Sequence, residues 1–483
     1  MPKERLSPHL QPSSGQKASH RAAKAAPRPR ASLASLTFWP AGGSLLVLLC
    51  LSLGACSSLP PIELYPQPRP ATEVLVFVPG ITGVQLRDRE TSKVLWGTGP
   101  RLLFPRDGGY GVALPIRSAS EGSAETTDGV EAFAPIEKIR LLKVFGKEVY
   151  GPVFELLTSN GFRRGKLEAP TSDDNLFSYS YDWRRDNVVA VKNLVDHLAK
   201  LQILRGQPLK VNLVCQSNGA HLCRYLAKYG ASSLEQAEAG GTPLPPGIEI
   251  SKLILIGTSN GGSLRILREM NRGRNYLGPF GRHWSQEAVF TFQSLYQDLP
   301  AYRTDLFVDE QGKSLPVDLY EAENWLTYGW SIYGEKTRKR LQDRPRPDLF
   351  GNADQRRAFL EENLATARRF QQLLHQDAPG FGHPRYYLIQ NVYEETADRA
   401  LLVREKGQWR TYFTGDKRLN KAPYLRALTS APGDGHAAKT SQLFLSPQET
   451  NALGAAPFYV QGGHFELILD PGAKRRLLEF IND

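Results

Sequence analysis

The stretch VNLVCQSNGAHLCRYLAKYG, Val211 to Gly230, changes its character at Ser217. Val211 to Cys215 is a short apolar run of the kind that forms a buried strand. The residues that follow the serine, Ala220 to Lys228, are expected to form a helix. We therefore expect Ser217 to lie at the hinge between a strand and a helix.

The two residues that flank this hinge at a distance of two positions are both small, Cys215 and Gly219. A tight strand-to-helix turn needs small residues there, because a bulky side chain would collide with the neighbouring strand or helix. The pattern is that of a nucleophile elbow, with Cys215 where a glycine normally stands. It predicts an exposed Ser217 hydroxyl at the carboxyl edge of a sheet. A turn serine without chemistry is the alternative.

The overall composition is that of a large globular protein. The chain has 483 residues, of which 41% are hydrophobic and 10% aromatic, enough for one large domain or two smaller ones. Its net charge of +11 is concentrated at the start, where residues 1 to 56 hold seven Lys and Arg against one acid. The remainder is nearly balanced, and no patch suited to DNA is evident, so we predict no nucleic acid partner.

The amino-terminal region resembles an export signal. A basic lead precedes the apolar run SLLVLLCLSLGAC, Ser44 to Cys56, which is too short for a stable membrane span. Its end, Leu53 to Cys56, resembles a bacterial lipobox. We predict a signal peptide over 1–56, a lipid on Cys56, a Pro-rich tether over 57–72, and anchoring to a bacterial cell-envelope membrane, periplasmic or at the cell surface. Cleavage without lipidation is the alternative.

The chain holds four cysteines. Cys50 would leave with the signal peptide and Cys56 would carry lipid, so Cys215 and Cys223 remain in the folded part. Both lie in the strand-to-helix segment, where a buried thiol is the commoner fate. We predict no structural disulfide.

From Glu73 onward strand and helix patterns alternate, which predicts an α/β domain with a mostly parallel sheet. The expected strands are 73–78, 176–183, 209–215, 251–257 and 385–392, and the expected helices include one that ends near Asn160 and another over 187–206.

A nucleophilic serine needs a base, and the base needs an oriented acid. In this architecture the order along the chain is serine, acid, histidine. His464, in the Gly-rich sequence QGGHFEL near the carboxyl terminus, is the predicted base, and Asp434, in APGDGHAA, is the predicted acid. His436 is a rival base, but it lies only two positions from the acid, which favours a loop role.

An oxyanion hole would complete such a site with two backbone N–H groups. One is expected from Asn218, which follows the serine. The other is expected from Ile81 in PGITGVQL, where Gly80 and Gly83 allow the backbone to approach a substrate closely. An ordinary glycine-containing turn is the alternative.

Several short stretches resemble, in the same order, the lecithin:cholesterol acyltransferase-like lipases. They are VFVPGITGVQL, FGKEVYGPVFELLTSNGF, YDWRRDN, VNLVCQSNG, LIGTSNGGS, SLYQDLP, PGDGHAA and GGHFEL, and they run from about Glu73 to the end. DLYEAENWLTYGW is similar to the lid region of the bacterial branch. The resemblance implies an α/β-hydrolase fold with a core over 73–265 and 384–483 and a cap or lid over 266–383.

Carried over by position, the resemblance makes Ser217 the nucleophile, Asp434 the acid and His464 the base. It also implies that Asp182 and Trp183, in the YDWR element, contact the substrate as part of the pocket wall. The segment VLWGTGPRLLFP, with Trp96, is expected either to dip into a lipid interface or to form a covered loop.

The chain departs from the family's usual pattern at Gln216, Asn218, Ser259 and Asn260. These residues predict a more polar pocket rim, which leaves the acyl substrate open. The predicted cap is rich in aromatic residues. Many of them are expected to hold the cap together, whereas some, including Trp284, Phe292 and Tyr296, are expected to line an acyl groove.

The sequence therefore predicts a serine acyl hydrolase or acyltransferase that acts on lipid esters and forms an acyl-enzyme. An esterase of non-lipid substrates, or an inactive binding lipoprotein of the same fold, remains an alternative. We predict no cofactor and no metal, a lipid or ester substrate, contact with a membrane surface through the anchor, and a monomer.

Overall fold

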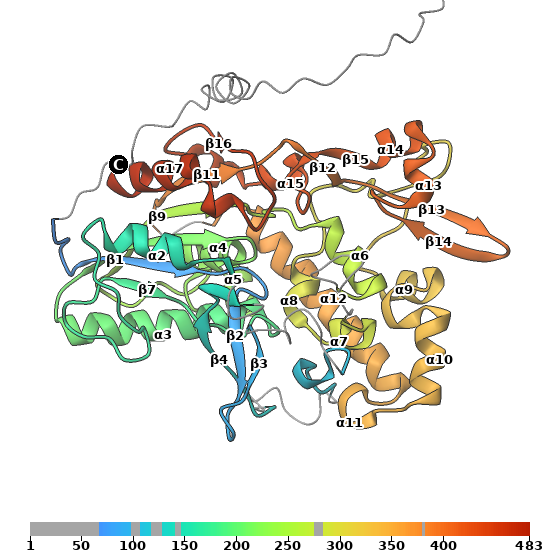
Figure 1. The fold of residues 1–483 in the computed structure, drawn as a ribbon, viewed down its shortest axis with the longest axis horizontal. Coiled ribbons are helices and arrows are strands. Elements are labelled where there is room, and N and C mark those ends of the chain that lie inside the picture. Colours follow the sequence, from blue (N-terminus) through green and yellow to red (C-terminus); the bar gives the residue numbers. More distant parts are fainter. Residues whose placement is uncertain (1–66, 98–106, 117–127, 141–145, 275–283, 379–381) are drawn as a thin grey trace, which may run out of the picture. The chain divides into compact units, whose positions relative to one another are not determined.

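A computed structural model describes residues 67–97, 107–116, 128–140, 146–274, 284–378 and 382–483, all within the unit Leu59–Asp483. At the centre of this unit is a six-stranded sheet with the order β16-β11-β9-β8-β1-β7, in which every neighbouring pair is parallel (Figure 1). The strands are β1 (Glu73–Val78), β7 (Leu176–Ser178), β8 (Leu209–Gln216), β9 (Ile248–Ile256), β11 (Arg385–Gln390) and β16 (Phe458–Tyr459). The chain thus has an α/β-hydrolase fold with a mostly parallel central sheet.

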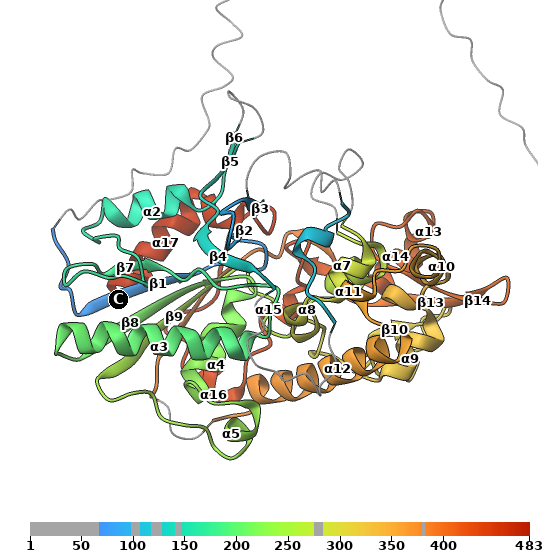
Figure 2. The ribbon, with the colours of Figure 1, turned by 90° about the horizontal axis from the view of Figure 1, so that it is seen from below.

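Helices cover both faces of this sheet. Helices α3 (Asn187–Arg205) and α4 (Gly219–Tyr229) lie on one face, and α2 (Gly151–Thr158) and α17 (Pro471–Asn482) lie on the other (Figure 2). Strand β1 is buried on both sides, because Val74 and Val76 pack into one apolar cluster while Leu75 and Phe77 pack into the other. This explains its nearly continuous apolar sequence.

Most of the predicted elements agree with the structure. Strand β1 has the predicted bounds and α3 is one residue shorter than predicted; α3 begins where the Asp186 side chain accepts a hydrogen bond from Val188 N–H. The helix ends at Gly206, whose φ of 64° is left-handed. The predicted strand 176–183 was too long, because β7 ends at Ser178. The chain then turns away from the sheet, and its tyrosines enter side-chain hydrogen bonds.

The described residues 264–274 and 284–375 form mainly helices, which lie to the right of the sheet in Figure 1, and the six sheet strands lie outside these ranges. It contains α6 (Leu264–Arg272), α7 (Gln286–Phe290), α8 (Gln293–Gln297), β10 (Phe307–Val308), α9 (Ala322–Tyr328), η4 (Ser331–Tyr333), α10 (Glu335–Asp343), α11 (Pro347–Phe350) and α12 (Ala353–His375). Helix α12 packs against α4, where the Phe370 and Tyr225 rings stack 5.5 Å apart. The segment therefore shares a continuous apolar core with the sheet.

The remaining elements are small. They are β2 (Val84–Asp88), β3 (Val94–Trp96), η1 (Tyr110–Val112), β4 (Val130–Pro135), β5 (Lys138–Arg140), β6 (Gly146–Glu148), α5 (Leu234–Glu238), β12 (Glu394–Ala397), β13 (Ala400–Glu405), β14 (Gln408–Tyr412), α13 (Lys417–Asn420), α14 (Pro423–Thr429), β15 (Ser430–Gly433), α15 (Lys439–Gln442), α16 (Pro447–Asn451) and η5 (Leu467–Leu469). In the part of the chain that the structure describes, no helix has both the length and the apolarity needed to cross a membrane.

The predicted signal peptide, Cys56 and most of the predicted tether lie outside the described residues, as do residues 98–105 of the VLWGTGPRLLFP segment. Trp96 is described. It is buried, and its indole N–H donates to the Thr82 carbonyl at 2.9 Å.

Candidate active site

Ser217 lies in a sharp turn between the end of β8 and the start of α4. Its φ of 53° is left-handed, which is uncommon for a residue with a side chain and is tolerated only where the surroundings enforce it. Two glycines make room for the turn. A Cβ on Gly219 would lie 2.3 Å from the Val78 carbonyl oxygen, and a Cβ on Gly80 would lie 2.7 Å from the Ser217 Cβ.

The structure brings Ser217, His464 and Asp434 together from three distant parts of the chain. His464 Nε2 lies 2.9 Å from Ser217 Oγ, and His464 Nδ1 lies 2.7 Å from Asp434 Oδ2. All three residues are buried, so the prediction that Ser217 is exposed was wrong: the turn is packed against its neighbours. A histidine held in this way can take the hydroxyl proton at Nε2 while the carboxylate stabilises the resulting imidazolium.

The carboxylate of Asp434 is oriented by its own turn. Its second oxygen, Oδ1, accepts hydrogen bonds from the N–H groups of His436 at 2.8 Å and Ala437 at 2.7 Å. Oδ2 is thereby left to face the His464 ring. This turn, in which Gly433 and Gly435 flank the aspartate, therefore directs the acid toward the histidine.

His436, the rival base, has a different place. Its Nδ1 lies 3.4 Å from Ser263 Oγ, and its ring packs 4.4 Å from the His464 ring, measured between centroids. Burial, together with the neighbouring His464, holds the pKa of His436 well below its usual value. His464, rather than His436, is thus the histidine within hydrogen-bond distance of Ser217.

Ile81 and Asn218, the predicted oxyanion donors, flank the serine. Ile81 follows the end of β1, and Asn218 is the residue before α4. Among the described residues, neither backbone N–H is engaged in a hydrogen bond. The Asn218 side chain points inward, where its amide donates to Asn187 Oδ1 at 3.0 Å. The two N–H groups have the chemistry to receive a negatively charged oxygen next to Ser217.

Four aromatic residues predicted to contact substrate are buried in the core instead. Trp183, Trp284, Phe292 and Tyr296 are at most 2% exposed. The Trp183 ring stacks on that of Trp284 at 5.8 Å and meets that of Phe292 edge-on at 5.5 Å. The Tyr296 ring packs separately, against those of Phe290 and Trp325. The interpretation of the four residues as a groove wall was wrong, because their rings are buried against other aromatic rings in the core.

Asp182 also has a structural environment. It accepts hydrogen bonds from Arg184 Nε at 2.8 Å and from Arg185 Nε at 3.2 Å. Burial acts to raise the pKa of Asp182, but the charges of the two arginines outweigh it and hold that pKa below its usual value. Arg184 is fully buried and also pairs with Asp128 at 2.6 Å. The predicted substrate contact at Asp182 is therefore an internal ion-pair network.

The residues expected to make the pocket rim polar are turned inward as well. Gln216 Oε1 accepts hydrogen bonds from Tyr150 Oη at 2.9 Å and from Gly80 N–H at 3.2 Å. Asn260 donates to the Gln442 carbonyl at 2.5 Å, and both side chains are buried. The expected polar rim is thus not formed by these groups.

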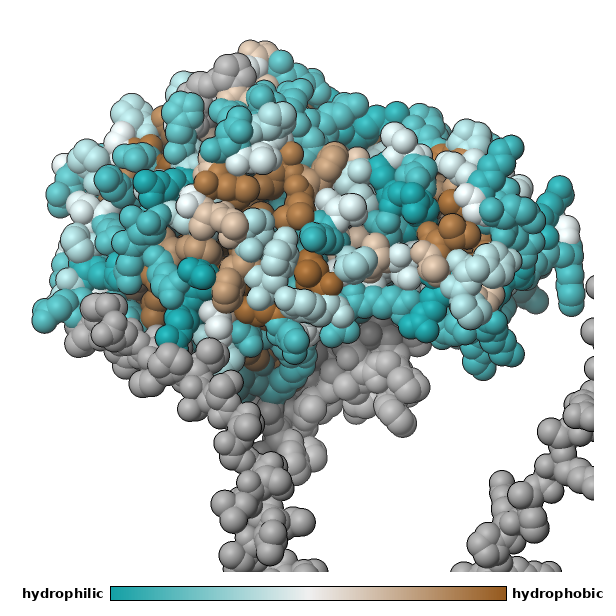
Figure 3. Space-filling view, turned by 90° about the horizontal axis from the view of Figure 1, so that it is seen from above, coloured by the Kyte–Doolittle hydropathy of each residue, from teal (hydrophilic) through white to brown (hydrophobic). Residues whose placement is uncertain are grey.

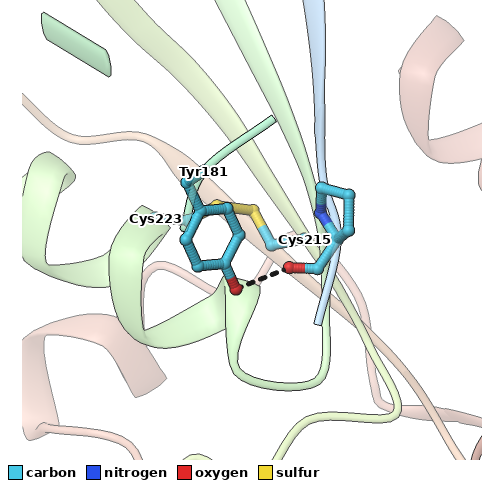
Figure 4. Close-up of a disulfide and its surroundings, with 4 residues drawn as sticks. Tyr181, Cys215 and Cys223 are labelled. Carbon is cyan, nitrogen blue, oxygen red and sulfur yellow. Dashed lines mark hydrogen bonds between the residues drawn. A yellow bond between two sulfur atoms is a disulfide. The ribbon is translucent and has the colours of Figure 1, made fainter. Parts of the chain in front are cut away.

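The prediction that Cys215 and Cys223 are separate thiols was wrong. They form a disulfide with a Cα–Cα distance of 6.6 Å, drawn in Figure 4. The turn at Ser217 folds α4 back along β8, so that positions eight residues apart come within the range that a disulfide spans. The spacing of the two cysteines, together with the predicted export, was the signal that would have indicated this bond.

An apolar side chain is exposed next to His464. Phe465 is 42% exposed, and its ring lies 5.1 Å from that of His464. Tyr393 and Leu443 are also exposed. Figure 3, which looks down on the top of Figure 1, shows hydrophobic residues gathered in the middle of this face, which also carries β16 and α15.

No group of three or more His, Cys, Asp or Glu side chains among the described residues has the arrangement of a metal site.

No family model matches the chain, and no curated protein matches it. Among solved structures, the chain is similar to a chain in "The crystal structure of Tle4-Tli4 complex", with a TM-score of 0.48 and 13% identity over 87% of this chain and 98% of that chain.

Proposed function

We propose that the protein is a serine acyl hydrolase, or an acyltransferase, of the lecithin:cholesterol acyltransferase-like type that acts on lipid esters. One observation carries the proposal: the hydrogen-bonded series Ser217, His464 and Asp434, with the serine on a strained turn at the carboxyl edge of a parallel sheet. A turn serine without chemistry needs neither the strain nor the two partners.

The reaction follows from this geometry. Ser217 Oγ attacks the ester carbonyl and gives its proton to His464 Nε2, while Asp434 stabilises the imidazolium through Nδ1–H. The negative charge on the carbonyl oxygen is received by the N–H groups of Ile81 and Asn218. His464 then gives its proton to the departing alcohol, which leaves an acyl group on Ser217.

The acceptor decides the second half of the reaction. His464 takes a proton from an incoming water or alcohol, whose oxygen then attacks the acyl carbonyl and releases Ser217. Water gives a fatty acid, and an alcohol such as a sterol or a lipid gives a new ester. The exposed apolar side chain of Phe465, next to His464, favours an acyl chain as the substrate, in preference to a small polar ester.

A matched pair of proteins tests this proposal. The purified full-length chain and its Ser217→Ala variant are given p-nitrophenyl esters of graded chain length and phospholipid vesicles, and acyl release is measured. We expect release by the parent alone, with a preference for long chains, and labelling of Ser217 by a fluorophosphonate. A preference for short chains would favour a non-lipid esterase. Two folded, equally inert proteins with no label at Ser217 would favour the binding lipoprotein.

Lipid attachment at Cys56, after export, is a separate part of the proposal. It rests on the lipobox-like sequence Leu53 to Cys56 and on the Pro-rich residues that follow. Cells fed an alkyne fatty acid should label the parent and not the Cys56→Ala variant. Equal labelling of both would exclude this residue as the anchor.

A further inference from the structure

The peptide unit between Pro79 and Gly80 is held at both of its polar ends by side chains. Its carbonyl oxygen accepts a hydrogen bond from Tyr181 Oη at 2.9 Å, which is the dashed line in Figure 4. Its N–H donates to Gln216 Oε1 at 3.2 Å. A trans peptide is planar and its C=O and N–H point in opposite directions, so these two bonds together fix the orientation of the plane.

This peptide unit directly precedes the one that carries the Ile81 N–H. Gly80 is the joint between the two units, and without a Cβ it has unusual rotational freedom. It cannot be replaced by a stiffer residue, because a Cβ there would lie 2.7 Å from both Ser217 Cβ and Gln216 Oε1. The direction of the Ile81 N–H therefore depends on how firmly the Pro79–Gly80 unit is held.

Both side chains that hold this unit are also tied to the serine turn. Gln216 is the residue before Ser217. The Tyr181 hydroxyl also accepts a hydrogen bond from the Asn218 side chain at 3.3 Å, on the residue that bears the other predicted oxyanion N–H. Each side chain thus connects the loop after β1 with the turn after β8, one on either side of the peptide.

The surroundings keep these side chains in place. Tyr181 is 3% exposed, its ring stacks on that of Tyr179 at 5.7 Å, and it lies next to the Cys215–Cys223 disulfide (Figure 4). Burial raises the pKa of Tyr181, so its hydroxyl keeps its proton and remains a donor. On the other side, Tyr150 Oη donates to Gln216 Oε1 and holds the amide oxygen toward Gly80.

We propose that Tyr181 and Gln216 are positioning residues that hold the Pro79–Gly80 peptide and thereby set the distance between the oxyanion donors, the N–H groups of Ile81 and Asn218. The proposal rests on the proposed function, since it concerns the same site. Neither side chain is assigned contact with the reacting atoms. Their effect passes through the backbone to the position of the developing negative charge.

Tyr181→Phe is the primary test, and Tyr179→Phe is its matched control. Tyr179 is equally buried, and its hydroxyl also donates to a backbone carbonyl, that of Ala190 at 2.6 Å, away from the serine turn. We expect Tyr181→Phe to lower kcat about 10- to 100-fold on a soluble p-nitrophenyl ester, somewhat less than the loss of an oxyanion donor itself. KM should stay within about threefold, because the oxyanion forms only after substrate binding. Tyr179→Phe should leave kcat within about twofold.

An alkyl trifluoromethyl ketone reports on the oxyanion hole directly. Ser217 Oγ adds to its carbonyl carbon, the carbonyl π pair becomes the charge on oxygen, and the serine proton passes to His464. We expect the inhibition constant of this adduct to rise in Tyr181→Phe by about the same factor as kcat falls. Urea midpoints should fall similarly in Tyr181→Phe and Tyr179→Phe, so a loss of stability alone does not explain the difference.

Gln216→Met tests the other end of the peptide, with Tyr150→Phe as its control. Tyr150→Phe removes one bond to Gln216 but leaves its bond to Gly80, so it should lower kcat less than Gln216→Met. Tyr181 and Gln216 hold the same peptide plane. The kcat of the double variant Tyr181→Phe, Gln216→Met should therefore fall by less than the product of the fold losses in the two single variants.

The failure of the positioning role and the failure of the proposed function give different results. A parent with Ser217-dependent turnover, together with a Tyr181→Phe variant whose kcat and inhibition constant stay within twofold, would overturn the positioning role alone, as would an equal kcat loss in Tyr179→Phe. A parent without Ser217-dependent turnover would overturn the proposed function and the positioning role with it.

Discussion

The two halves of the candidate site are held by different means. The serine half is local: Ser217 lies inside the loop closed by the Cys215–Cys223 disulfide, against Gly219 packed on the end of β1. The acid and base half is assembled over long distances, with Asp434 and His464 separated by 30 residues and His464 separated from Ser217 by 247.

A substitution should therefore have different effects in the two halves of the site. The serine half has covalent and steric support that also contributes to the fold, so damage there should lower stability and rate together. The acid and base half depends on hydrogen bonds between loops, so damage there should lower the rate with little loss of stability.

Asp434→Asn should have the largest effect on rate. The amide oxygen can still accept from His436 and Ala437, but the amide NH₂ then faces His464 Nδ1 and favours the wrong tautomer. We expect kcat to fall about 10³- to 10⁴-fold, with unfolding free energy changed by about 1 kcal/mol or less. Ester hydrolysis and urea unfolding measure the two. Asp470→Asn, at the start of α17, is the control. A variant that keeps a tenth of parental kcat would contradict the assignment of the acid.

Gly219→Ala should damage stability and rate together. The new methyl would lie 2.3 Å from the Val78 carbonyl oxygen, so β1 and the loop that carries Ile81 must shift. We expect a loss of about 3 kcal/mol, and a lower kcat as well. Gly151→Ala is the matched control, since Gly151 also begins a helix and its Cβ would meet nothing closer than 3.4 Å. Urea unfolding that shows equal losses in both variants would refute the steric explanation.

Replacing both Cys215 and Cys223 with alanine isolates the covalent support. The disulfide closes a short loop, which predicts a loss of about 2 to 3 kcal/mol in unfolding free energy through the unfolded chain. A reducing agent should destabilise the parent to a similar extent and leave the double variant unaffected. If alkylation of the denatured, oxidised parent without a reductant modifies both Cys215 and Cys223 in the tryptic peptide from Val211 to Arg224, the bond is absent from the protein.

His436→Gln should have the smallest effect, confined to the pH dependence of stability. The folded-state pKa of His436 is held well below its usual value by burial and by His464, with Arg265 and Arg274 acting in the same direction. In the unfolded chain His436 therefore binds a proton near its ordinary pKa of about 6.5, whereas in the folded chain it stays neutral at that pH. The folded state thus loses stability as the pH falls below about 6.5.

His436→Gln removes this linkage, so the stability of the variant should depend less steeply on pH, by up to about 1.4 kcal/mol per pH unit below about pH 6. Urea unfolding between pH 4.5 and 7.5 measures the slope. We expect kcat to stay within about tenfold, because the His436 backbone N–H that orients Asp434 is retained. Parallel curves for the parent and the variant would show that His436 is not the group concerned.

Local patterns were sufficient to predict most of the fold. Strand β1 and helix α3 were predictable because an apolar run bounded by Pro79, and a helix closed by Gly206, are properties of neighbouring residues. The end of β7 was not, because an edge strand ends where its one neighbour stops pairing, and the tyrosines that continue its alternation serve other contacts. The chain order of Ser217, Asp434 and His464 was enough to predict which side chains would meet.

The surroundings of the site were harder to predict, for a physical reason. A tryptophan such as Trp183 can fill a core or line a groove, and only the packing of distant segments decides between them. The roles of Tyr181 and Gln216 depend on the backbone of Pro79 and Gly80, about 100 residues or more away. Composition carries no signal for such a contact.

Whether the disulfide next to Ser217 forms depends on the compartment in which the protein folds. Two sulfur atoms at these positions remain separate thiols in a chain that folds in a reducing compartment, and join in a chain that folds in an oxidising one. The same polypeptide thus has two covalent versions, distinguished by where it was made. A preparation recovered from a reducing cytosol would carry a looser serine turn than one secreted from the same gene, and the two would differ by two hydrogen atoms in the single tryptic peptide from Val211 to Arg224.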